Sequence, residues 1–495
     1  MKLFSKLILF VILSCVITPP VWGKRGVKEA VVKIYTVYNR HNYDEPWKML
    51  SQKRRSGSGC IISGRRILTN AHVVSDQKFI QIKKAGEAKK YTAEVEIVAH
   101  ECDLAILRIN DDSFFSGVNP IEIGGLAEIR DKVAVYGFSE GGDELCITEG
   151  VVSRVEHRKY SHSRAYLLTC QIDAAINPGS SGGPVVKDDK IVGVAFQAGS
   201  GENIGYMVPA PVINHFLEDI KDGKYDGIPG LGISWQKMEN PDIRLKFGMT
   251  ENQTGMLVNK IYPDSPARGV LKSGDIVLSL DGKNVENDGT IEFREGERTF
   301  SGYLVQNKYI NDTVNFEILR ENSCMNIEMK LTAPMNFGRL VPYEQYDVAP
   351  TYYILGGLVF EPLTLNFLKT WKKWYLSAPS DLVNYYFRGE PTDERREIVV
   401  LVKVLADEIN VGYHEWKNSV ISYANGKKIS TMKDLVSAFE EHEGKYHAIV
   451  DEHGYRIVLD KNKVDENSQR ILKKYRINSD RSRDLERPEK HEPQI

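Results

Sequence analysis

The sequence is short of cysteine, of excess charge and of long apolar runs. Its 495 residues include six cysteines, and 65 Lys and Arg residues nearly balance 67 Asp and Glu residues, for a formal net charge of -2. This balance argues against a nucleic-acid partner or a membrane-surface partner. Beyond the N-terminal segment, no apolar run approaches the roughly 20 residues that cross a bilayer. The length exceeds what one core can support and predicts about three domains.

Most of the cysteines are scattered, without the spacing of a metal site or a disulfide framework. Five follow the N-terminal segment, namely Cys60, Cys102, Cys146, Cys170 and Cys324. Such an odd set predicts buried free thiols. Cys102 adjoins Asp103 and is a candidate redox switch, although an inert buried thiol is the favoured interpretation. No metal or nucleotide motif is evident, so we expect an activity without a cofactor.

The N-terminus has the pattern of a secretory signal peptide. Lys2 and Lys6 precede an apolar run from Leu7 to Ile17, and Gly23 is a small residue at the expected cleavage point. We predict a signal peptide at residues 1–23 and export without a permanent anchor, to the periplasm in a bacterial source. Two alternatives stay open: an uncleaved anchor, for which a run of about eleven residues is short, and lipidation at Cys15.

One serine is framed by glycines that leave the surrounding backbone amides free. It is Ser181, in the run Asn177–Pro184 with the sequence NPGSSGGP. A serine attacks at neutral pH only if a positioned base takes its proton, and the resulting oxyanion needs amide donors. His72 in LTNAHVV and Asp103 in CDLAIL supply a base and a carboxylate. The order His, Asp, Ser is that of double-barrel serine proteases.

Each of these motifs also has a plain structural interpretation. The glycine run alone would more often be a flexible turn, and Asp103 could simply precede a buried strand from Leu104 to Ile109. All three in one order favour a catalytic triad. In that triad Ser181 attacks, His72 carries the proton and Asp103 holds the imidazole.

These motifs resemble those of the HtrA/Deg family of ATP-independent serine proteases. The likeness covers nearly the whole chain and includes the strand Gly57–Ile62 before the histidine and the segment Gln171–Gly179 before the serine. From Gly230 onward the chain is most similar to the plant-organelle branch. One position departs from the family pattern, because Ser180 stands where Asn is common. That substitution keeps the backbone amide.

The resemblance also implies further site residues. The amides of Gly179 and Ser181, with Ser180, would form the oxyanion hole. Ile176 would line the primary specificity pocket and favour a small apolar side chain before the cut. The segment Val155–Tyr166 would be a sensor loop that orders the oxyanion loop when a PDZ ligand binds.

The pattern of short β-rich runs and turns predicts a mainly β fold. A chymotrypsin-like double β-barrel protease domain is expected at residues 24–222, and two α+β PDZ-like domains at 223–334 and 335–470. The segment Tyr38–Arg55 interrupts the first barrel and is expected to be a surface loop near the active site. Residues 471–495 are charged and are expected to be disordered.

A short glycine motif marks the first PDZ-like domain. Gly230, Leu231, Gly232 and Ile233 resemble the PDZ loop whose amides hold a peptide's terminal carboxylate. The run Leu271–Lys283 is typical of the PDZ core in this family, although an unrelated β-domain is an alternative. A weaker echo at 420–429 predicts the second PDZ-like domain, whose carboxylate loop matches poorly.

The predicted function is ATP-independent endoproteolysis of unfolded or misfolded proteins in protein quality control. The PDZ domains would serve substrate binding, regulation or assembly. The expected partners are protein substrates, peptide C-termini at the first PDZ domain and, by resemblance, further copies of the chain in a trimer-based assembly. The alternative is a chaperone or PDZ-based binding protein with little or no protease activity.

Overall fold

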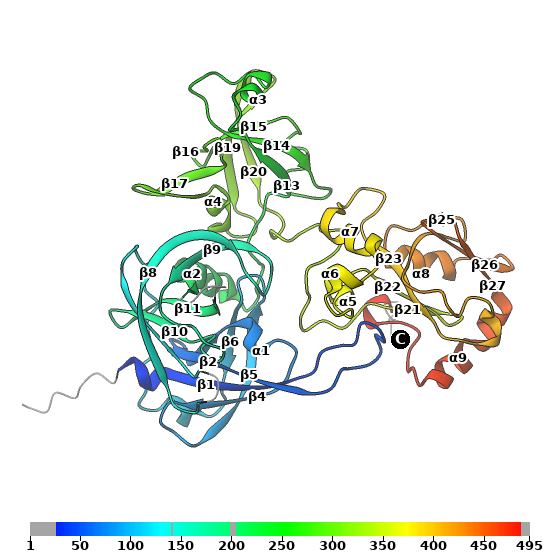
Figure 1. Cartoon of the computed structure of the whole chain (residues 1–495), viewed down its shortest axis with the longest axis horizontal. Helices are drawn as coiled ribbons and strands as arrows, with labels where there is room; N and C mark the ends of the chain where they lie inside the picture. Colours follow the sequence, from blue (N-terminus) through cyan, green and yellow to red (C-terminus); the bar gives the residue numbers. More distant parts are fainter. Residues whose placement is uncertain (1–25, 140–141, 199–203, 487–495) are drawn as a thin grey trace, which may run out of the picture.

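The computed structural model describes residues 26–139, 142–198 and 204–486, which form three bodies (Figure 1). A protease-like body of two β-barrels carries one smaller sheet unit above it in this view and a second beside it. The predicted signal peptide at 1–23 lies outside the described residues. The mainly β architecture expected from the sequence is confirmed.

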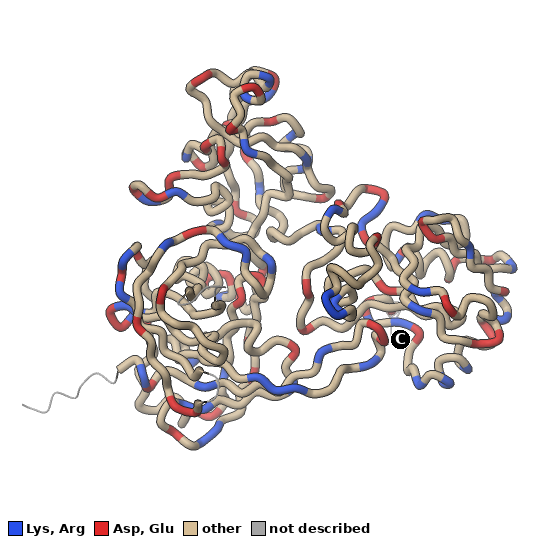
Figure 2. Tube along the Cα trace, in the orientation of Figure 1, with Lys and Arg blue, Asp and Glu red and all other residues tan. Residues whose placement is uncertain are grey.

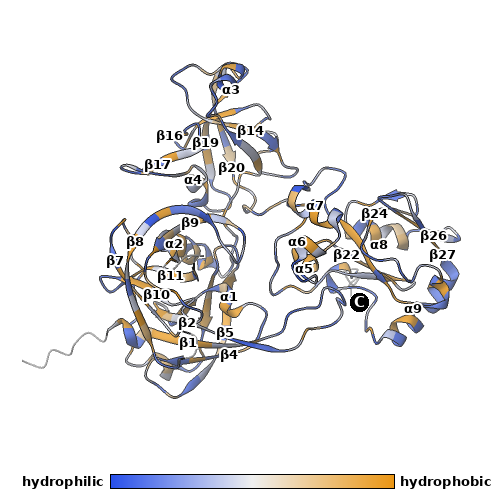
Figure 3. Cartoon of the chain, in the orientation of Figure 1, coloured by the Kyte–Doolittle hydropathy of each residue, from blue (hydrophilic) through white to orange (hydrophobic). Residues whose placement is uncertain are grey.

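Two closed barrels of six strands each make up the N-terminal body. The first contains β1 (Val31–Tyr38), β2 (Lys53–Ile62), β3 (Arg66–Thr69), β4 (Gln77–Lys84), β5 (Lys90–Ala99) and β6 (Leu104–Arg108). The second contains β7 (Lys132–Gly137), β8 (Cys146–Lys159), β9 (Tyr166–Ile172), β10 (Pro184–Lys187), β11 (Lys190–Ala198) and β12 (Gly205–Pro209). Their β-branched and leucine side chains fill the interiors, and Figure 3 shows the apolar residues concentrated along these strands.

Short helices connect and cover the barrels. Helix α1 (Ala71–Val74) follows β3 directly and carries His72. Helix α2 (Ala210–Asp219) follows β12, starts with proline near its first turn and buries Ile213 and Phe216.

The first PDZ-like unit is a sheet in the order β13-β14-β15-β19-β20, with β16 paired to β15. Its strands are β13 (Ile233–Lys237), β14 (Met256–Ile261), β15 (Ile276–Leu280), β16 (Lys283–Asn284), β19 (Thr313–Arg320) and β20 (Ser323–Lys330). A hairpin of β17 (Thr290–Arg294) and β18 (Glu297–Phe300) and the helices α3 (Pro241–Lys246) and α4 (Gly302–Gln306) complete it. Strand β13 lies at the edge of the sheet.

The second PDZ-like unit has the sheet order β21-β22-β23-β24-β26-β27, with β25 paired to β24. Its strands are β21 (Tyr353–Leu355), β22 (Leu358–Pro362), β23 (Val399–Val404), β24 (Ser419–Ala424), β25 (Lys427–Lys428), β26 (Tyr446–Asp451) and β27 (Arg456–Asp460). Its helices are α5 (Leu365–Leu368), α6 (Trp374–Ser377), α7 (Ser380–Arg388), α8 (Met432–Glu440) and α9 (Lys461–Tyr475).

The expectation of a disordered tail from residue 471 was wrong for the residues up to 486. Helix α9 extends to Tyr475 and buries Ile471 and Leu472, and the following chain buries Leu485. A β-bridge also joins Arg481 to Tyr353 of β21. The charged residues cover the outer face of an amphipathic helix, which masks the narrow apolar face in the local composition.

The segment between β1 and β2 is not the free surface loop that we expected. It runs out of the first barrel and reaches the second PDZ-like unit (Figure 1). There Tyr43 is buried among apolar residues of that unit, and the rings of Trp47 and Tyr352 meet edge to face at 6.1 Å. Asp44 accepts an ion-pair contact from Lys403 at 2.7 Å. The protease body and the second unit are therefore joined by packing as well as by the chain.

Lys and Arg residues are interspersed with Asp and Glu residues along the chain in all three bodies (Figure 2). This distribution agrees with the near-zero net charge. In the part of the chain that the structure describes, no helix is both long and apolar enough to cross a membrane.

Candidate active site

His72 lies in α1 after β3, Asp103 lies directly before β6, and the two side chains meet beside the first barrel. His72 Nδ1 lies 2.7 Å from one carboxylate oxygen of Asp103, and the His72 backbone N–H donates to the other at 2.9 Å. Since an ionised carboxylate only accepts, the proton on His72 sits on Nδ1. The opposite ring nitrogen is then the basic one. This is the tautomer that a general base needs.

The Asp103 carboxylate is almost fully buried, with 1% of the residue exposed. Burial alone would raise its pKa, but the nearby His72 and His162 and the hydrogen bonds from His72 hold the pKa below its usual value. The carboxylate therefore stays ionised at neutral pH. Its backbone is held as well, because the buried Asn70 side chain donates to the Asp103 carbonyl at 2.8 Å.

The chain approaches Ser181 through a tight turn. The Ser180 N–H donates to the Asn177 carbonyl at 3.0 Å, Pro178 occupies the second position and Gly179 the third with φ of 93°. These are the features of a type II turn, which requires a residue with positive φ at its third position. Gly182 also has positive φ, and a Cβ there would lie 2.1 Å from the Ser58 carbonyl oxygen. Glycine is therefore required at both sites.

The same turn decides which amides are available to an oxyanion. The Ser180 amide is occupied by Asn177, so the sequence-based assignment of Ser180 to the oxyanion hole does not fit the structure. The amides of Gly179 and Ser181 stay as candidates. Ser58 holds the turn in place, because its hydroxyl donates to the Gly179 carbonyl at 2.7 Å and accepts from the Phe138 N–H at 2.8 Å.

Ser181 itself directly follows this turn and is half-buried. Its carbonyl accepts from the Ser58 N–H at 2.8 Å, which ties it to the first barrel. Both residues lie in the part of the chain that the structure describes, and the Ser181 hydroxyl makes no hydrogen bond to His72 there. Such contacts often tighten only when substrate binds.

Ile176 occupies an apolar position five residues before Ser181. It is 7% exposed and packs with the apolar core of the second barrel. A Cβ on Gly205 of β12 would lie 2.7 Å from Ile176 Cδ1, so the two residues are in direct contact. The side chain of Ile176 thus packs against the backbone of Gly205 in an apolar setting.

The predicted carboxylate loop lines a cavity of about 300 Å³ between the first PDZ-like unit, the chain that follows it from Met335 to Tyr343, and residues Gly389–Pro391 of the second unit. The cavity lies beside the edge strand β13 and helix α4, and includes Gly230, Leu231, Gly232 and Ile233. The Gly230 amide donates to the Ala333 carbonyl at 3.1 Å, and Met335 lies against Gly230. The amides of Leu231 and Gly232 are therefore better placed than that of Gly230 to receive a carboxylate.

The expected sensor loop is largely a β-hairpin. Strand β8 extends to Lys159 and β9 begins at Tyr166, so only residues 160–165 form the connection. Within the hairpin, the buried His157 contacts Thr299 at 2.7 Å and Gln306 at 2.9 Å, both in the first PDZ-like unit. This hairpin therefore contacts the unit that carries the predicted peptide groove.

Sequence reasoning missed a histidine pair behind the triad. His162, in the 160–165 connection, lies with its ring centroid 6.1 Å from that of His72. His100 contacts it at 3.0 Å. No local motif marks these two histidines, since each is an isolated residue in the sequence.

Family comparisons agree with the order of the domains. Residues 57–194 match the trypsin-like peptidase domain, and residues 229–331 and 341–484 each match a PDZ domain. The mitochondrial protease Do-like 4 of Arabidopsis thaliana is 40% identical over 415 residues, which cover 83% of this chain and 76% of that protein. The chain belongs to the Do-like (HtrA/Deg) family of serine proteases.

Other relatives extend this picture of the Do-like family. The chloroplastic protease Do-like 2 of Arabidopsis thaliana is 37% identical over 470 residues, covering 93% of this chain and 76% of that protein. A solved structure described as HtrA-type protease AlgW with decapeptide is 24% identical, covers 62% of this chain and 96% of its own, and has a TM-score of 0.48. As a member of the Do-like family, this chain is a serine protease with PDZ domains. This membership favours a protease function over a binding function without protease activity.

Proposed function

We propose that this Do-like protease cleaves unfolded or misfolded proteins without ATP, with Ser181 as nucleophile, His72 as general base and acid, and Asp103 as the group that orients His72. The contact between His72 Nδ1 and the buried Asp103 carboxylate carries this proposal, because it fixes the tautomer required for proton transfer. The amides of Gly179 and Ser181 stabilise the oxyanion. Ile176 sets a preference for a small apolar side chain before the cut.

The nucleophile is tested by comparing two adjacent serines. Ser181→Ala should lower kcat on casein and on a short reporter peptide by up to about a millionfold, because it removes the attacking hydroxyl. Ser180→Ala keeps its backbone amide and should retain most of the activity. The reaction should proceed without ATP and in the presence of EDTA. Substantial cleavage by Ser181→Ala, or loss of activity in EDTA that zinc restores, would contradict the proposed chemistry.

Peptide C-termini are the proposed ligands of the first PDZ unit. The edge strand β13 can accept a further strand, and the Leu231 and Gly232 amides lie in the adjoining cavity. A free carboxylate on these amides makes charge-assisted contacts of about 1.5 to 3 kcal/mol, so amidation of the peptide should weaken binding about tenfold or more. Calorimetry with paired free and amidated peptides measures this difference, and equal affinities would exclude the carboxylate loop.

Regulation through this unit is a separate proposal. Peptide binding should stimulate cleavage of a short reporter, because the β8–β9 hairpin contacts the first PDZ unit through His157. Unchanged turnover at saturating peptide would leave the unit as a substrate tether only.

The destination and assembly of the chain are also proposals. We propose that residues 1–23 direct export and are removed, with organelle import as the alternative that the mitochondrial and chloroplastic relatives suggest. N-terminal sequencing of the mature protein and cell fractionation distinguish these outcomes and also reveal a lipid on Cys15. We propose a trimer-based assembly, which light scattering after size-exclusion chromatography tests.

A further inference from the structure

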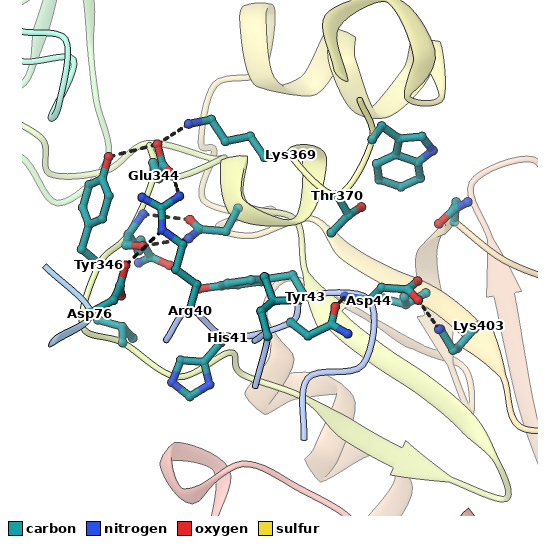
Figure 4. A pocket seen from close by; sticks show the side chains of 18 of the residues that line it. Arg40, His41, Tyr43, Asp44, Asp76, Glu344, Tyr346, Lys369, Thr370 and Lys403 are labelled. Atoms are coloured by element: carbon teal, nitrogen blue, oxygen red, sulfur yellow. Dashed lines mark hydrogen bonds and ion pairs between the residues drawn. The ribbon is translucent and has the colours of Figure 1, made fainter. Parts of the chain in front are cut away.

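A short connecting segment lies against the back of the triad. We call residues 344–347 the strap; they lie before β21, near the start of the segment 341–484 that matches the second PDZ domain, and contact the protease body (Figure 4). The Tyr346 ring stacks on the His162 ring with centroids 4.0 Å apart and planes 21° apart. The Tyr346 hydroxyl also donates to the His162 carbonyl at 3.2 Å. One residue of the strap thus holds both the ring and the backbone of His162.

The next residue of the strap holds the helix that carries His72. Asp347 accepts from the Asp76 N–H at 2.6 Å, and the Asp347 N–H donates to the Asp76 carboxylate at 3.0 Å. Asp76 lies two residues after α1, so this reciprocal pair fixes the C-terminal end of that helix. The strap therefore contacts both His162 and the end of the helix that carries His72.

A chain of hydrogen bonds links the strap to the histidine pair. Asp347 contacts His100 Nε2 at 2.8 Å, and His100 Nδ1 contacts His162 Nε2 at 3.0 Å. An ionised carboxylate only accepts, so His100 donates from Nε2. In the neutral ring His100 Nδ1 then accepts, and His162 donates from Nε2. Asp347 in this way orients both rings.

Ion pairs also hold the strap against the protease body and the second PDZ unit. The single proton of the Tyr346 hydroxyl is shared between the His162 carbonyl and a Glu344 carboxylate oxygen at 3.0 Å, and Glu344 also pairs with Lys369 of the second PDZ unit. Arg40, in the β1–β2 segment, bridges Glu344 and Asp76 at 3.3 Å each. Figure 4 shows these side chains converging along one wall of a cavity of about 770 Å³. The anchoring groups come from the protease body, the strap and the second unit together.

We propose that Tyr346 and Asp347 are positioning residues for proteolysis, which hold His162, His100 and the His72 helix in the arrangement that keeps Asp103 buried against His72. This inference rests on the proposed triad. It assigns the connection after the first PDZ unit to the structure of the active site rather than to a passive linker.

The test uses the full chain and a short reporter peptide that engages no PDZ groove. Tyr346→Ala and Asp347→Ala should each lower kcat about tenfold or more, with KM changed by less than about twofold, because orientation rather than binding is lost. Tyr346→Phe keeps the stacked ring and should retain most of the wild-type kcat. Such retention would show that the rate depends on the stacked ring and not on the hydroxyl. Tyr375→Ala, at an exposed tyrosine of the second unit, is the matched control and should leave kcat unchanged.

The pH profile separates positioning from general destabilisation. His162 faces Asp103, His72, His100, Glu344 and Tyr346, and burial holds its pKa at about 4. Removing the Tyr346 ring exposes His162, so its pKa should return toward about 6.5. A second ionisation should then steepen the acid limb of kcat in Tyr346→Ala but not in Tyr375→Ala.

The outcomes are distinguishable from a failure of the triad. If Ser181→Ala is inactive while Tyr346→Ala and Asp347→Ala keep both kcat and the acid limb of the wild type, the strap has no positioning role. If Tyr346→Ala does not fold, Asp347→Asn decides the question through the same two measurements, and an unchanged kcat and acid limb in that variant overturn the inference. Activity in Ser181→Ala would instead remove the proposed function itself.

Discussion

Asp103 contacts His72 with both of its carboxylate oxygens, one on the ring Nδ1 at 2.7 Å and one on the backbone N–H at 2.9 Å. The carboxylate thus fixes the tautomer of the ring and the position of the residue that carries it. We expect Asp103→Asn to lower kcat about ten-thousandfold with little change in fold, because an amide in this position stabilises the wrong tautomer. Single-turnover kinetics on the reporter peptide measure the loss, and a decrease of less than about tenfold would contradict the role of Asp103.

The Ser58 hydroxyl should matter for rate more than for binding. Ser58→Ala removes the donor to the Gly179 carbonyl and leaves the buried Phe138 N–H without its acceptor. We expect kcat to fall about tenfold to a hundredfold because the oxyanion turn loses its support, while KM changes little. Ser116→Ala, at an exposed serine, is the control. An unchanged kcat in Ser58→Ala would mean that the turn holds its shape without this contact.

Acidification should weaken the contact between the protease body and the first PDZ unit. Burial lowers the pKa of His157 to about 4, although its hydrogen bond to Gln306 opposes this shift. The unfolded chain binds a proton near pH 6.5 and the folded chain does not, so stability is full above that pH and falls as the pH drops toward 4. The loss for this imidazole is up to about 3 kcal/mol.

Urea denaturation across that pH range measures this effect. His157→Gln should flatten the dependence of the free energy of unfolding on pH. His453→Gln is the control, since the His453 side chain is 60% exposed. Equal slopes for wild type and His157→Gln would show that His157 titrates as it does in the unfolded chain.

Cys324 should be the thiol that reacts first in the folded protein. It is exposed, whereas Cys60, Cys102 and Cys170 are buried and Cys146 is half-buried, so the expectation of five buried thiols was wrong for Cys324. Burial raises the pKa of Cys170 to about 12, which suppresses its reactive thiolate. In the chain beginning at residue 24, Cys324→Ser should abolish the fast phase of labelling by a thiol reagent. Persistence of that phase would place the reactive thiol elsewhere.

The three catalytic residues could be proposed from the sequence because each lies in a dense local pattern. Glycines with positive φ surround Ser181, and His72 and Asp103 each adjoin a buried strand. Local sequence could not reveal Tyr346, which contacts His162 across 184 positions of the chain. Contacts over such separations depend on the packing of whole domains, and no single motif records them.

Two sequence-based expectations were wrong because a segment's polarity was taken for exposure. Residues 471–486 and the β1–β2 segment are rich in polar side chains, yet each buries a few apolar residues such as Leu472 and Tyr43. The occupied Ser180 amide is a different case. Sequence indicates that an amide exists, but only the turn geometry shows its acceptor.

The β1–β2 segment gives the second PDZ unit a two-point attachment. Covalent connection after residue 334 supplies one point, and the burial of Tyr43 with the Asp44–Lys403 pair supplies the other. With two attachment points, the second PDZ unit cannot reorient freely relative to the protease body. Deleting residues from 335 onward would remove the apolar neighbours of Tyr43 and Trp47 and expose both side chains to solvent. Shortened versions of the enzyme should therefore be prone to self-association.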